Sequence, residues 1–453
     1  MNRLEKEIRE QYFDTIFKAL KNKEKEQFLE YFLELHPTDQ VELFVDLYKD
    51  KRPMFYEYLS ATEFADIFQG LDVETQKEVI KELDKDYVAT MFNHMQSDDI
   101  AGFLCEINEP HAKYILNAMD KEEADKVIEL LSYPEESAGA IMTKEFMTIK
   151  AADSASEVME RIRTVGLDAE TVYYLYVINE ENKLLGVVSL RELIVAPLDE
   201  QIVNIMSTKI VSVEANTDQE EVAKVIKDYD LLAAPVVTTT NELIGIVTVD
   251  DVIDVLEKEA TEDFGEISAV KGATDVNITS LSAAKKRSPW IVMLMLFGLV
   301  TAGVIGQFEE TLEEIVLLAV FIPLIMASAG NVGTQSLAVM VRSLATGTFK
   351  KKGLWNTIKR EFGTGILLGI ICAAVLMIIV PFLYGSYILA FIVGISLFLT
   401  LSIATVIGAI VPVAINKLKL DPAIASGPFI TTVNDILGIL IYFSIATLLL
   451  QYL

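Results

Sequence analysis

The residue with the clearest chemical consequence is Asp435, an aspartate inside the last long apolar run of the chain. If that run spans a membrane as a helix, Asp435 lies roughly 18 Å from its start, near the middle of the bilayer. A carboxylate at that depth costs on the order of 3 kcal/mol unless it faces a polar cavity or a partner. Gly427, Thr431 and Gly438 share its helical face. The pattern favours a cation site lining a pore; the alternative is an aspartate satisfied by Asn434 or by a hydroxyl of a neighbouring helix.

A second apolar run carries uncharged polar groups in the stretch FIPLIMASAGNVGTQSLAV. Pro323 should kink or break its helix, and Gly330 permits close approach of another backbone. Ser328, Asn331 and Gln335 are spaced i, i+3, i+7, so they lie on one helical face. Carbonyl, amide and hydroxyl oxygens can coordinate the water shell of an ion. The stretch therefore predicts either part of a pore lining or a glycine-rich seam for helix packing.

Acidic residues crowd a third stretch, VDDVIDVLEKEATEDFGE, which has the apolar spacing of a helix. Asp250, Asp254 and Glu257 share one of its faces. Like charges at i, i+4 destabilise a helix, so something cationic is expected to offset them. A hard divalent ion fits, because carboxylate oxygens and water are its preferred ligands. The alternative is a solvated linker helix whose charges simply repel one another.

Charge is distributed unevenly along the 453 residues, whose formal net charge is −28. Residues 1–284 hold 27 basic and 59 acidic side chains, a net of −32, whereas residues 285–453 hold 11 and 7, a net of +4. An acidic, soluble N-terminal part is therefore joined to an apolar, slightly basic C-terminal part. The acidity excludes nucleic acid as a partner and favours cations, or else it serves solubility alone.

The sequence lacks the residue patterns of a disulfide framework, a zinc site or an enzyme active site. The two cysteines, Cys105 and Cys372, provide no disulfide framework, and the three histidines have no zinc-type spacing. No constellation of nucleophile, base and catalytic metal is present, which argues against an enzyme. The N-terminus is an amphipathic charged helix without the apolar core of a signal peptide, so we expect the soluble part in the cytoplasm.

Residues 1–138 are predicted to form a helical domain. Short segments place apolar residues at i, i+3, i+4 and i+7, separated by polar breaks with cap residues such as Asp72 and Ser97–Asp98. The pattern recurs loosely every 22 to 25 residues, which is typical of a superhelical stack of helices.

Residues 139–260 contain an internal repeat of about 60 residues. The first copy, 139–199, aligns with the second, 200–260, so that Met142 matches Met206 and Gly186 matches Gly245. Each copy has the pattern strand, helix, strand, turn, strand, helix.

This repeat resembles a pair of CBS (cystathionine-β-synthase) domains, and the junctions GVVSLRELI and GIVTVDDVI carry the resemblance. CBS pairs often dimerise, and often bind adenine nucleotides through a Thr or Ser and an Asp at this junction. The second copy has Thr248 and Asp251, whereas the first has Ser189 with Arg191 and Glu192. The resemblance therefore implies at most one half-site for a ribose, and ATP as its candidate ligand.

Residues 285–453 are predicted to form a transmembrane domain of five helices, joined to the CBS pair by a connecting helix at 261–284. Each apolar run is long enough to cross a bilayer of roughly 30 Å hydrocarbon. Basic loops at 349–361 and 416–421 alternate with non-basic ones at 309–314 and 384–387. The basic loops should stay inside, so the soluble domains are expected in the cytoplasm and the C-terminus outside.

Taken together, the chain resembles the MgtE family of magnesium channels over essentially its whole length. The most specific motifs are PLIMASAGNVGTQS, LDPAIASGPFITTVNDILG and VTVDDVIDVLEKEATED. The family architecture is a multidomain one: an all-α superhelical N-domain, an α/β tandem CBS pair and a five-helix α transmembrane domain. The resemblance implies a homodimer in a cell (inner) membrane, with one pore at the two-fold axis built largely from the second and fifth spans.

The resemblance also implies roles for particular residues. The pore would use Asp435, Asp421 at the entrance of the fifth span, and Asn331 and Gly330 of the second. Intracellular Mg²⁺ would close the pore through sensing acids, which are Asp66, Asp98, Asp218, Glu220, Asp230, Asp251, Asp254, Glu259, Glu262 and Asp263. The connector would act as the plug that gates the pore, giving Mg²⁺ influx limited by feedback.

Departures from the family pattern leave other functions open. Ala327, Ala329 and Thr334 stand where relatives often have Gly or Asn, and Gly427 lacks the amide of some relatives. Leu231 stands where an aromatic residue could stack on an adenine. The alternatives are a CBS-regulated transporter of another ion, such as Co²⁺, and a membrane-bound nucleotide sensor that transports nothing. An anion pore would want basic pore residues, and these spans offer Asp435 and no buried Lys or Arg beyond Arg342.

Overall fold

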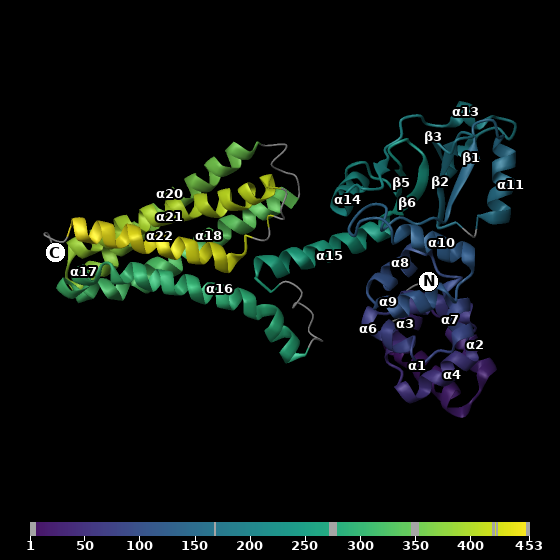
Figure 1. The fold of residues 1–453 in the computed structure, drawn as a ribbon, viewed down its shortest axis with the longest axis horizontal. Helices are drawn as coiled ribbons and strands as arrows, with labels where there is room; N and C mark the ends of the chain where they lie inside the picture. Colours follow the sequence, from purple (N-terminus) through teal and green to yellow (C-terminus); the bar gives the residue numbers. More distant parts are fainter. Residues whose placement is uncertain are drawn as a thin grey trace. The chain divides into compact units, whose positions relative to one another are not determined.

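The structure is a computed structural model that describes residues 6–166, 169–270, 279–345, 353–418, 422 and 425–449. It divides into two compact units, Met1–Leu256 and Glu257–Leu453, here termed the soluble unit and the membrane unit (Figure 1). Helix α15 (Val249–Ile267) begins in the first unit and ends in the second.

The first part of the soluble unit is helical, as the apolar spacing predicts. Phenylalanines form much of its core: Phe28, Phe32, Phe44 and Phe55 are fully buried and in mutual aromatic contact. Caps separate the helices; the predicted cap Asp72 accepts a hydrogen bond from the Thr75 N–H at 3.0 Å. The elements are α1 (Lys6–Asn22), α2 (Lys25–Leu33), α3 (Pro37–Val45), η1 (Lys49–Lys51), α4 (Arg52–Tyr58), α5 (Ala61–Gln69), α6 (Val73–Val79), α7 (Lys85–Phe92), α8 (Ser97–Cys105), α9 (Glu109–Leu116) and α10 (Lys121–Leu130).

The second part of the soluble unit confirms the predicted repeat. It holds two three-stranded sheets with the orders β1-β2-β3 and β4-β5-β6, each pairing its first two strands parallel and its last two antiparallel. The elements of the first copy are β1 (Phe146–Lys150), α11 (Ala155–Val165), β2 (Thr171–Ile178), β3 (Leu184–Ser189) and α12 (Leu190–Val195). Those of the second are α13 (Ile202–Ile205), β4 (Val213–Glu214), α14 (Gln219–Asp228), β5 (Ala233–Val237), β6 (Leu243–Thr248) and α15.

The two copies are locked together by the methionines and glycines that the repeat aligns. Met142, near the start of the first copy, lies against Gly245 of the second, where an added Cβ would be 2.5 Å from its sulfur. Reciprocally, Met206 lies against Gly186, where a Cβ would be 2.7 Å from the sulfur. Only glycine leaves room for this crossed contact, which explains why both residue types recur at the same place in each copy.

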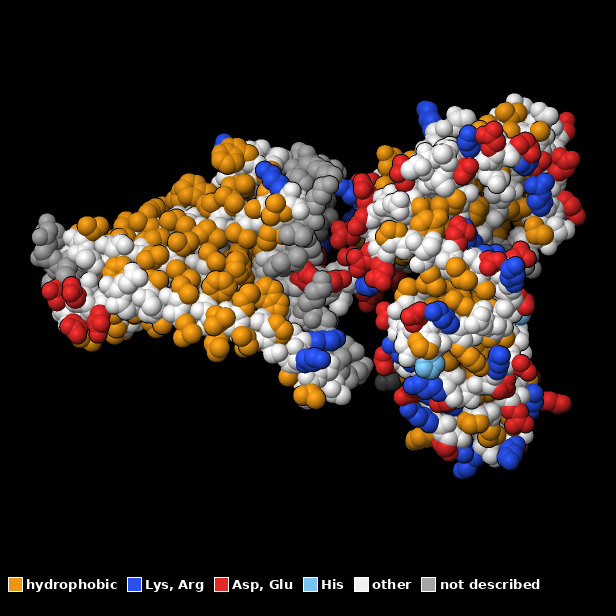
Figure 2. Space-filling model, viewed as in Figure 1, with side chains coloured by type: hydrophobic (Ala, Val, Ile, Leu, Met, Phe, Trp, Pro, Cys, Tyr) orange, Lys and Arg blue, Asp and Glu red, His pale blue; other side chains and the backbone are white. Residues whose placement is uncertain are grey.

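The membrane unit confirms five spans. Among the described residues, five helices are long and apolar enough to cross a membrane: α16 (Ser280–Gly306), α18 (Ile322–Ala345) with the preceding η2 (Val316–Phe321), α20 (Leu354–Tyr384), α21 (Tyr387–Lys417) and α22 (Gly427–Leu448). A short helix, α17 (Glu309–Glu314), links the first two. Hydrophobic side chains cover the visible face of this unit (Figure 2), and Phe382 of α20 is 88% exposed. Such surface is stable only in a lipid environment or against another protein.

Pro323 marks a break in the second span, as predicted. The chain runs as the 3-10 helix η2 up to Phe321, and α18 then begins with Pro323 in its first turn. A proline is tolerated there because its missing N–H would have no partner inside the helix.

The connector differs from the single helix predicted over 261–284. Residues up to Ile267 continue α15 without interruption, and α16 already begins at Ser280. Residues 271–278 lie outside the described residues. The end of α15 packs within the membrane unit, where Ile267 contacts a cluster that includes Leu337 and Ile430.

Candidate functional site

Acidic side chains from three separate segments meet in the soluble unit. Asp98 and Asp99 come from the first turn of α8, and Asp251 comes from the first turn of α15. Glu170 immediately precedes β2. Asp98 lies within electrostatic reach of Asp251 and Glu170, and Asp99 within reach of Asp250, Asp251 and Asp254. We refer to Asp98, Asp99, Glu170, Asp250, Asp251 and Asp254 as the acidic cluster.

The members of this cluster raise one another's pKa values. Burial raises the pKa of Asp98 well above its ordinary range, and the charges of Asp251, Asp99 and Glu170 raise it further. Burial raises the pKa of Glu170 to about 7, with further contributions from the charges of Asp251, Asp250, Asp99 and Glu145. The Asp98 Oδ1 atom is inaccessible to solvent and has no hydrogen-bond partner among the described residues. Folding therefore brings these negative charges together, and for the Asp98 Oδ1 atom it supplies no donor among the described residues.

The cluster suits a hydrated cation better than a bare one. Within the described residues, no three histidine, cysteine or acidic side chains are arranged closely enough to chelate a metal ion directly. Mg²⁺ gives up its water reluctantly and keeps several water ligands in most protein sites. Carboxylates spaced around a hydrated ion can neutralise its charge through those waters, so the donor set fits Mg²⁺.

Only part of the predicted sensor set belongs to this cluster. Asp98, Asp251 and Asp254 do, whereas Asp66, Asp218, Glu220 and Asp230 are exposed elsewhere on the soluble unit. Asp218 caps α14 by accepting a hydrogen bond from the Glu220 N–H at 2.9 Å. Glu259, Glu262 and Asp263 are half-buried on the part of α15 that belongs to the membrane unit.

Two members of the cluster were missed by sequence reasoning. Asp99 directly follows Asp98, and its position in the first turn of α8 could have suggested it. Glu170 carries no local signal, because it lies in a polar turn about 80 residues from Asp251. Only the folded chain brings it to the cluster.

The predicted nucleotide residues contact each other. The Thr248 hydroxyl donates to the Asp251 carboxylate, and the Thr248 N–H donates to the same Oδ2 atom at 3.3 Å. Asp251 is therefore turned back on the end of β6 and also belongs to the acidic cluster. A nucleotide phosphate at this position would be repelled by the neighbouring carboxylates.

The predicted pore residues lie on α18 and α22. Asn331 and Gln335 are exposed on α18, with Ser328 half-buried on the same side. Asp435 is half-buried on α22, and its Oδ1 atom has no hydrogen-bond partner among the described residues. Asn434 does not satisfy it, because both amide atoms of Asn434 are also buried without a hydrogen-bond partner among the described residues. Asp421 lies outside the described residues.

The glycine-rich stretch of α18 also forms the predicted packing seam, on a different face. Gly330 is buried against Thr431 of α22, where an added Cβ would be 2.5 Å from the threonine methyl group. The Thr334 hydroxyl donates to the Gly330 carbonyl at 2.6 Å and lies 3.4 Å from the Thr431 hydroxyl. The packing interpretation of this stretch is confirmed, because small residues join α18 to α22. Larger polar residues remain exposed beside the seam, and their role in lining a pore stays a prediction.

A second acid of the membrane unit, Glu361 on α20, was also missed. Its side chain is 8% exposed, and the Ser336 hydroxyl of α18 donates to its Oε2 atom at 2.8 Å. Arg360 donates to its Oε1 atom at 2.9 Å. The sequence offered only the basic loop around it as a signal, and that loop predicted orientation and not a buried contact.

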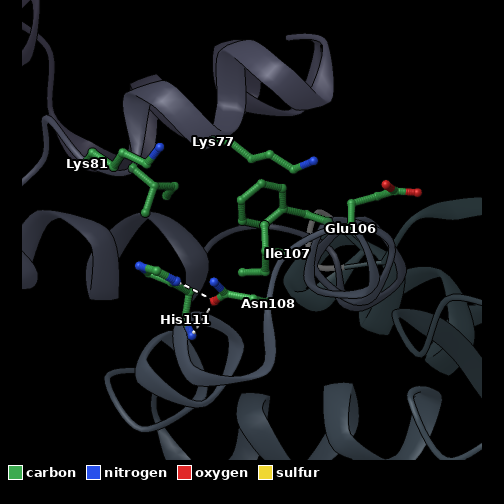
Figure 3. A pocket seen from close by; sticks show the side chains of 8 residues that line it. Lys77, Lys81, Glu106, Ile107, Asn108 and His111 are labelled. Carbon is green, nitrogen blue, oxygen red and sulfur yellow. Dashed lines mark hydrogen bonds between the residues drawn. The ribbon is translucent and has the colours of Figure 1, made fainter. Parts of the chain in front are cut away.

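A pocket of about 190 Å³ in the helical domain lies between α6, α8 and α9. Figure 3 shows Lys77 and Lys81 along one side, with Asn108 and His111 opposite. The Lys77 amine donates to Glu74 at 2.9 Å, and Glu106 is the one acid among the lining residues. The pocket is therefore not a cation site.

The fold and these sites define a membrane transport protein for a cation, with a regulatory soluble unit built around a CBS pair. Comparisons with known proteins agree. Family models match three regions: the MgtE intracellular N domain at residues 35–136, CBS domains at 138–199 and 202–258, and the MgtE divalent cation transporter domain at 322–445.

Three relatives that match nearly the whole chain are named magnesium transporter MgtE. The chain is 40% identical to the magnesium transporter MgtE of Bacillus subtilis (strain 168), over 91% of this chain and 92% of that protein. It is 35% identical to the magnesium transporter MgtE of Thermus thermophilus, over 96% and 98%. A crystal structure of the cytosolic domain of the Mg²⁺ channel MgtE in complex with ATP superposes on 54% of this chain and 99% of that one, with 34% identity and a TM-score of 0.51. The chain belongs to the MgtE family of magnesium transporters.

Proposed function

We propose that the protein is a Mg²⁺ channel whose pore forms between two copies of the chain. The observation that carries this proposal is the polar side of α18, where Asn331 and Gln335 are exposed on a helix that must cross the membrane. Lipid cannot satisfy amide groups, so another protein surface has to cover them. A second copy placed on a two-fold axis presents the same polar side and encloses a water-filled path between the two.

Asp435 is the residue that binds the ion in this pore. It lies eight residues into α22, roughly 12 Å from the start of the helix. Two copies of this carboxylate, facing each other across the axis, would hold one divalent cation through its hydration shell, with the amides of Asn331 and Gln335 completing the lining. Asp421 would attract ions at the entrance, as the family resemblance implies.

Mg²⁺ in the cytoplasm closes the pore by binding to the acidic cluster. Without the ion, Asp98, Glu170 and Asp251 repel one another, which favours separation of the helical domain from the CBS pair. An ion that binds only the closed arrangement shifts the population toward it. Support for a route to the pore comes from α15, which starts at the cluster and ends with Ile267 against the start of α22.

The direction of transport is influx. In this proposal the basic loops stay on the inner side, so that the soluble unit is cytoplasmic and the C-terminus is outside. A divalent cation then moves toward the negative interior, where the membrane potential favours entry by about 4.6 kcal/mol per 100 mV for two charges.

ATP is a proposed ligand of the CBS pair, supported by the related cytosolic domain that was crystallised with ATP. Thr248 and Asp251 remain the residues predicted for a ribose. Their mutual hydrogen bond and the acidic surroundings of Asp251 predict weak binding at that half-site.

The test is Mg²⁺ uptake into liposomes that contain the purified protein. Wild type should admit Mg²⁺, Asp435→Asn should abolish uptake, and Glu310→Gln, which neutralises an exposed acid of α17 in the same unit, should leave it unchanged. Uptake of Co²⁺ in preference to Mg²⁺ would move the assignment to another divalent cation. No uptake by wild type would favour a membrane-bound sensor that transports nothing.

A further inference from the structure

Glu145 lies where the helical domain meets the CBS pair, and it is surrounded by donors. Its side chain is 16% exposed. Its Oε2 atom accepts hydrogen bonds from the hydroxyls of Ser97 and Thr143, each at 2.8 Å, and from the Lys144 N–H at 3.2 Å. Lys126 of α10 pairs with its Oε1 atom at 3.3 Å. A carboxylate with this many donors is stabilised in its charged form, and its pKa is lowered below the ordinary range despite burial.

Glu145 also completes the start of α8. The N-cap residue Gln96 makes no side-chain capping bond, although the first turn of a helix has N–H groups without partners. The Ser97 N–H points instead at the Glu145 Oε2 atom, 3.4 Å away. A carboxylate at a helix N-terminus is favourable both as an acceptor and through the helix dipole. Glu145 therefore acts as a cap supplied from a different domain.

The same residue connects two arms of the acidic cluster. Through its side chain it holds Ser97, whose neighbour is Asp98. Through its main chain it holds Glu170, because the Glu170 N–H donates to the Glu145 carbonyl at 2.7 Å. Asp98 and Glu170 repel each other, so their approach requires a bond that opposes the repulsion. Thr143, two residues before Glu145, exchanges two backbone hydrogen bonds with Ile246 of β6. The segment that carries Glu145 is therefore fixed to the CBS pair.

We propose that Glu145 is a positioning residue for cation sensing, which holds Asp98 and Glu170 at the spacing a divalent cation requires before the ion arrives. This inference rests on the proposed role of the acidic cluster as a Mg²⁺ sensor. Glu145 itself does not contact the ion. Its carboxylate is occupied by Ser97, Thr143 and Lys126, and it acts by setting where the other acids lie.

The test is a Mg²⁺ titration of the full-length protein in detergent, followed by the melting temperature. The quantity of interest is the Mg²⁺ concentration that gives half of the full increase in melting temperature. Glu145→Gln should raise this concentration about tenfold, because part of the binding free energy must then hold the helical domain in place. Ser97→Ala removes one hydrogen-bond donor and leaves the Glu145 carboxylate in place, so it should raise the same Mg²⁺ concentration about threefold. This second variant keeps the inference testable if Glu145→Gln does not fold.

A matched control is available across the same domain junction. Lys144 pairs with Glu129 of α10, so Glu129→Gln removes an ion pair there without touching Ser97 or Glu170. It should lower the melting temperature with and without Mg²⁺ by the same amount and leave the midpoint within about twofold of wild type.

The outcomes separate this inference from the proposed function. If wild type responds to Mg²⁺ and both Glu145→Gln and Ser97→Ala have the same midpoint as wild type, the positioning role is overturned and the sensor role is not. A wild type whose melting temperature does not respond to Mg²⁺ would overturn both. A midpoint raised equally by Glu129→Gln would also overturn the inference, because any weakening of the junction would then suffice.

Discussion

In each of the two units, an acid that accepts several hydrogen bonds can be compared with an acid that has an oxygen without a hydrogen-bond partner among the described residues. In the soluble unit, Glu145 receives hydrogen bonds from both domains, whereas Asp98, next to Ser97 in the chain, has a buried oxygen without a partner in the described part of the structure. In the membrane unit, Glu361 is held by Ser336 and Arg360, whereas the Asp435 Oδ1 atom has no partner there.

This difference distinguishes acids that stabilise the fold from acids that are candidates for binding an ion. A buried carboxylate is costly unless donors or cations compensate it, and Glu145 and Glu361 have that compensation within one chain. Asp98 and Asp435 each have a buried oxygen without such compensation among the described residues. For Asp98 we propose an ion, and for Asp435 an ion together with a second copy of the protein.

The substitution Asp435→Ala is the strongest test of whether this acid binds an ion and does not stabilise the fold. If this acid binds the transported ion, uptake should fall at least about 100-fold, because an interaction of ~3 kcal/mol or more with the ion is lost. The melting temperature should stay the same or rise, since the buried Oδ1 atom has no hydrogen-bond partner among the described residues that the mutation would remove. Full uptake by Asp435→Ala in liposomes would remove this residue from the ion path.

Glu361→Gln should behave in the opposite way. The neutral amide keeps the shape but weakens the bonds from Ser336 and Arg360, so stability should fall by about 1.5–3 kcal/mol, the typical contribution of a hydrogen bond to a charged group. Denaturation in detergent measures this loss, and uptake per folded molecule should be retained. Lost uptake at unchanged stability would instead place Glu361 in the ion path.

The pH dependence of stability sharpens the comparison within the soluble unit. Folding raises the pKa of Glu170 to about 7, so its destabilising charge is fully present above that pH and is relieved as the pH falls toward its ordinary value of 4.5. Without divalent cations, the protein should therefore be more stable at pH 5.5 than at pH 8, by on the order of 2 kcal/mol.

The same measurement carries an internal control. The pKa of Glu145 is lowered, so its contribution is present above 4.5 and is lost as the pH falls through its folded value. Stability should accordingly turn downward in that lower range. Added Mg²⁺ should reduce the difference between pH 5.5 and pH 8, since it replaces protons in neutralising the cluster. A profile that is flat across this range would contradict the mutual repulsion of these acids.

The smallest expected effect is that of Asp98→Asn. Removing one charge from the acidic cluster should stabilise the Mg²⁺-free protein by about 1 kcal/mol and should weaken the response to Mg²⁺. Melting temperatures in chelator and in excess Mg²⁺ measure both. Asp14→Asn, at an exposed acid of α1 outside the cluster, is the matched control and should change neither by more than about 0.5 kcal/mol.

Much of the fold was predictable because it depends on local patterns. Apolar runs predicted five spans, and Pro323 predicted the break before α18, since both follow from the chemistry of neighbouring residues. The repeat was predictable by comparing the chain with itself, and the crossed contacts of Met142 and Met206 now give its physical cause. The connector was predicted less well. A separate helix was expected over 261–284, but α15 continues to Ile267, and no residue pattern around position 260 marks where one helix ends and another begins.

Position along a single helix is enough to identify Asp435 as an acid among apolar residues and to put Asn331 and Gln335 on one face. Other features appear only in the folded chain: Asp98, Glu170 and Asp251 meet, Glu145 caps a helix of another domain, and Ser336 donates to Glu361. Those contacts join residues 25 to about 150 positions apart, and packing of whole domains, which no local pattern encodes, brings them together.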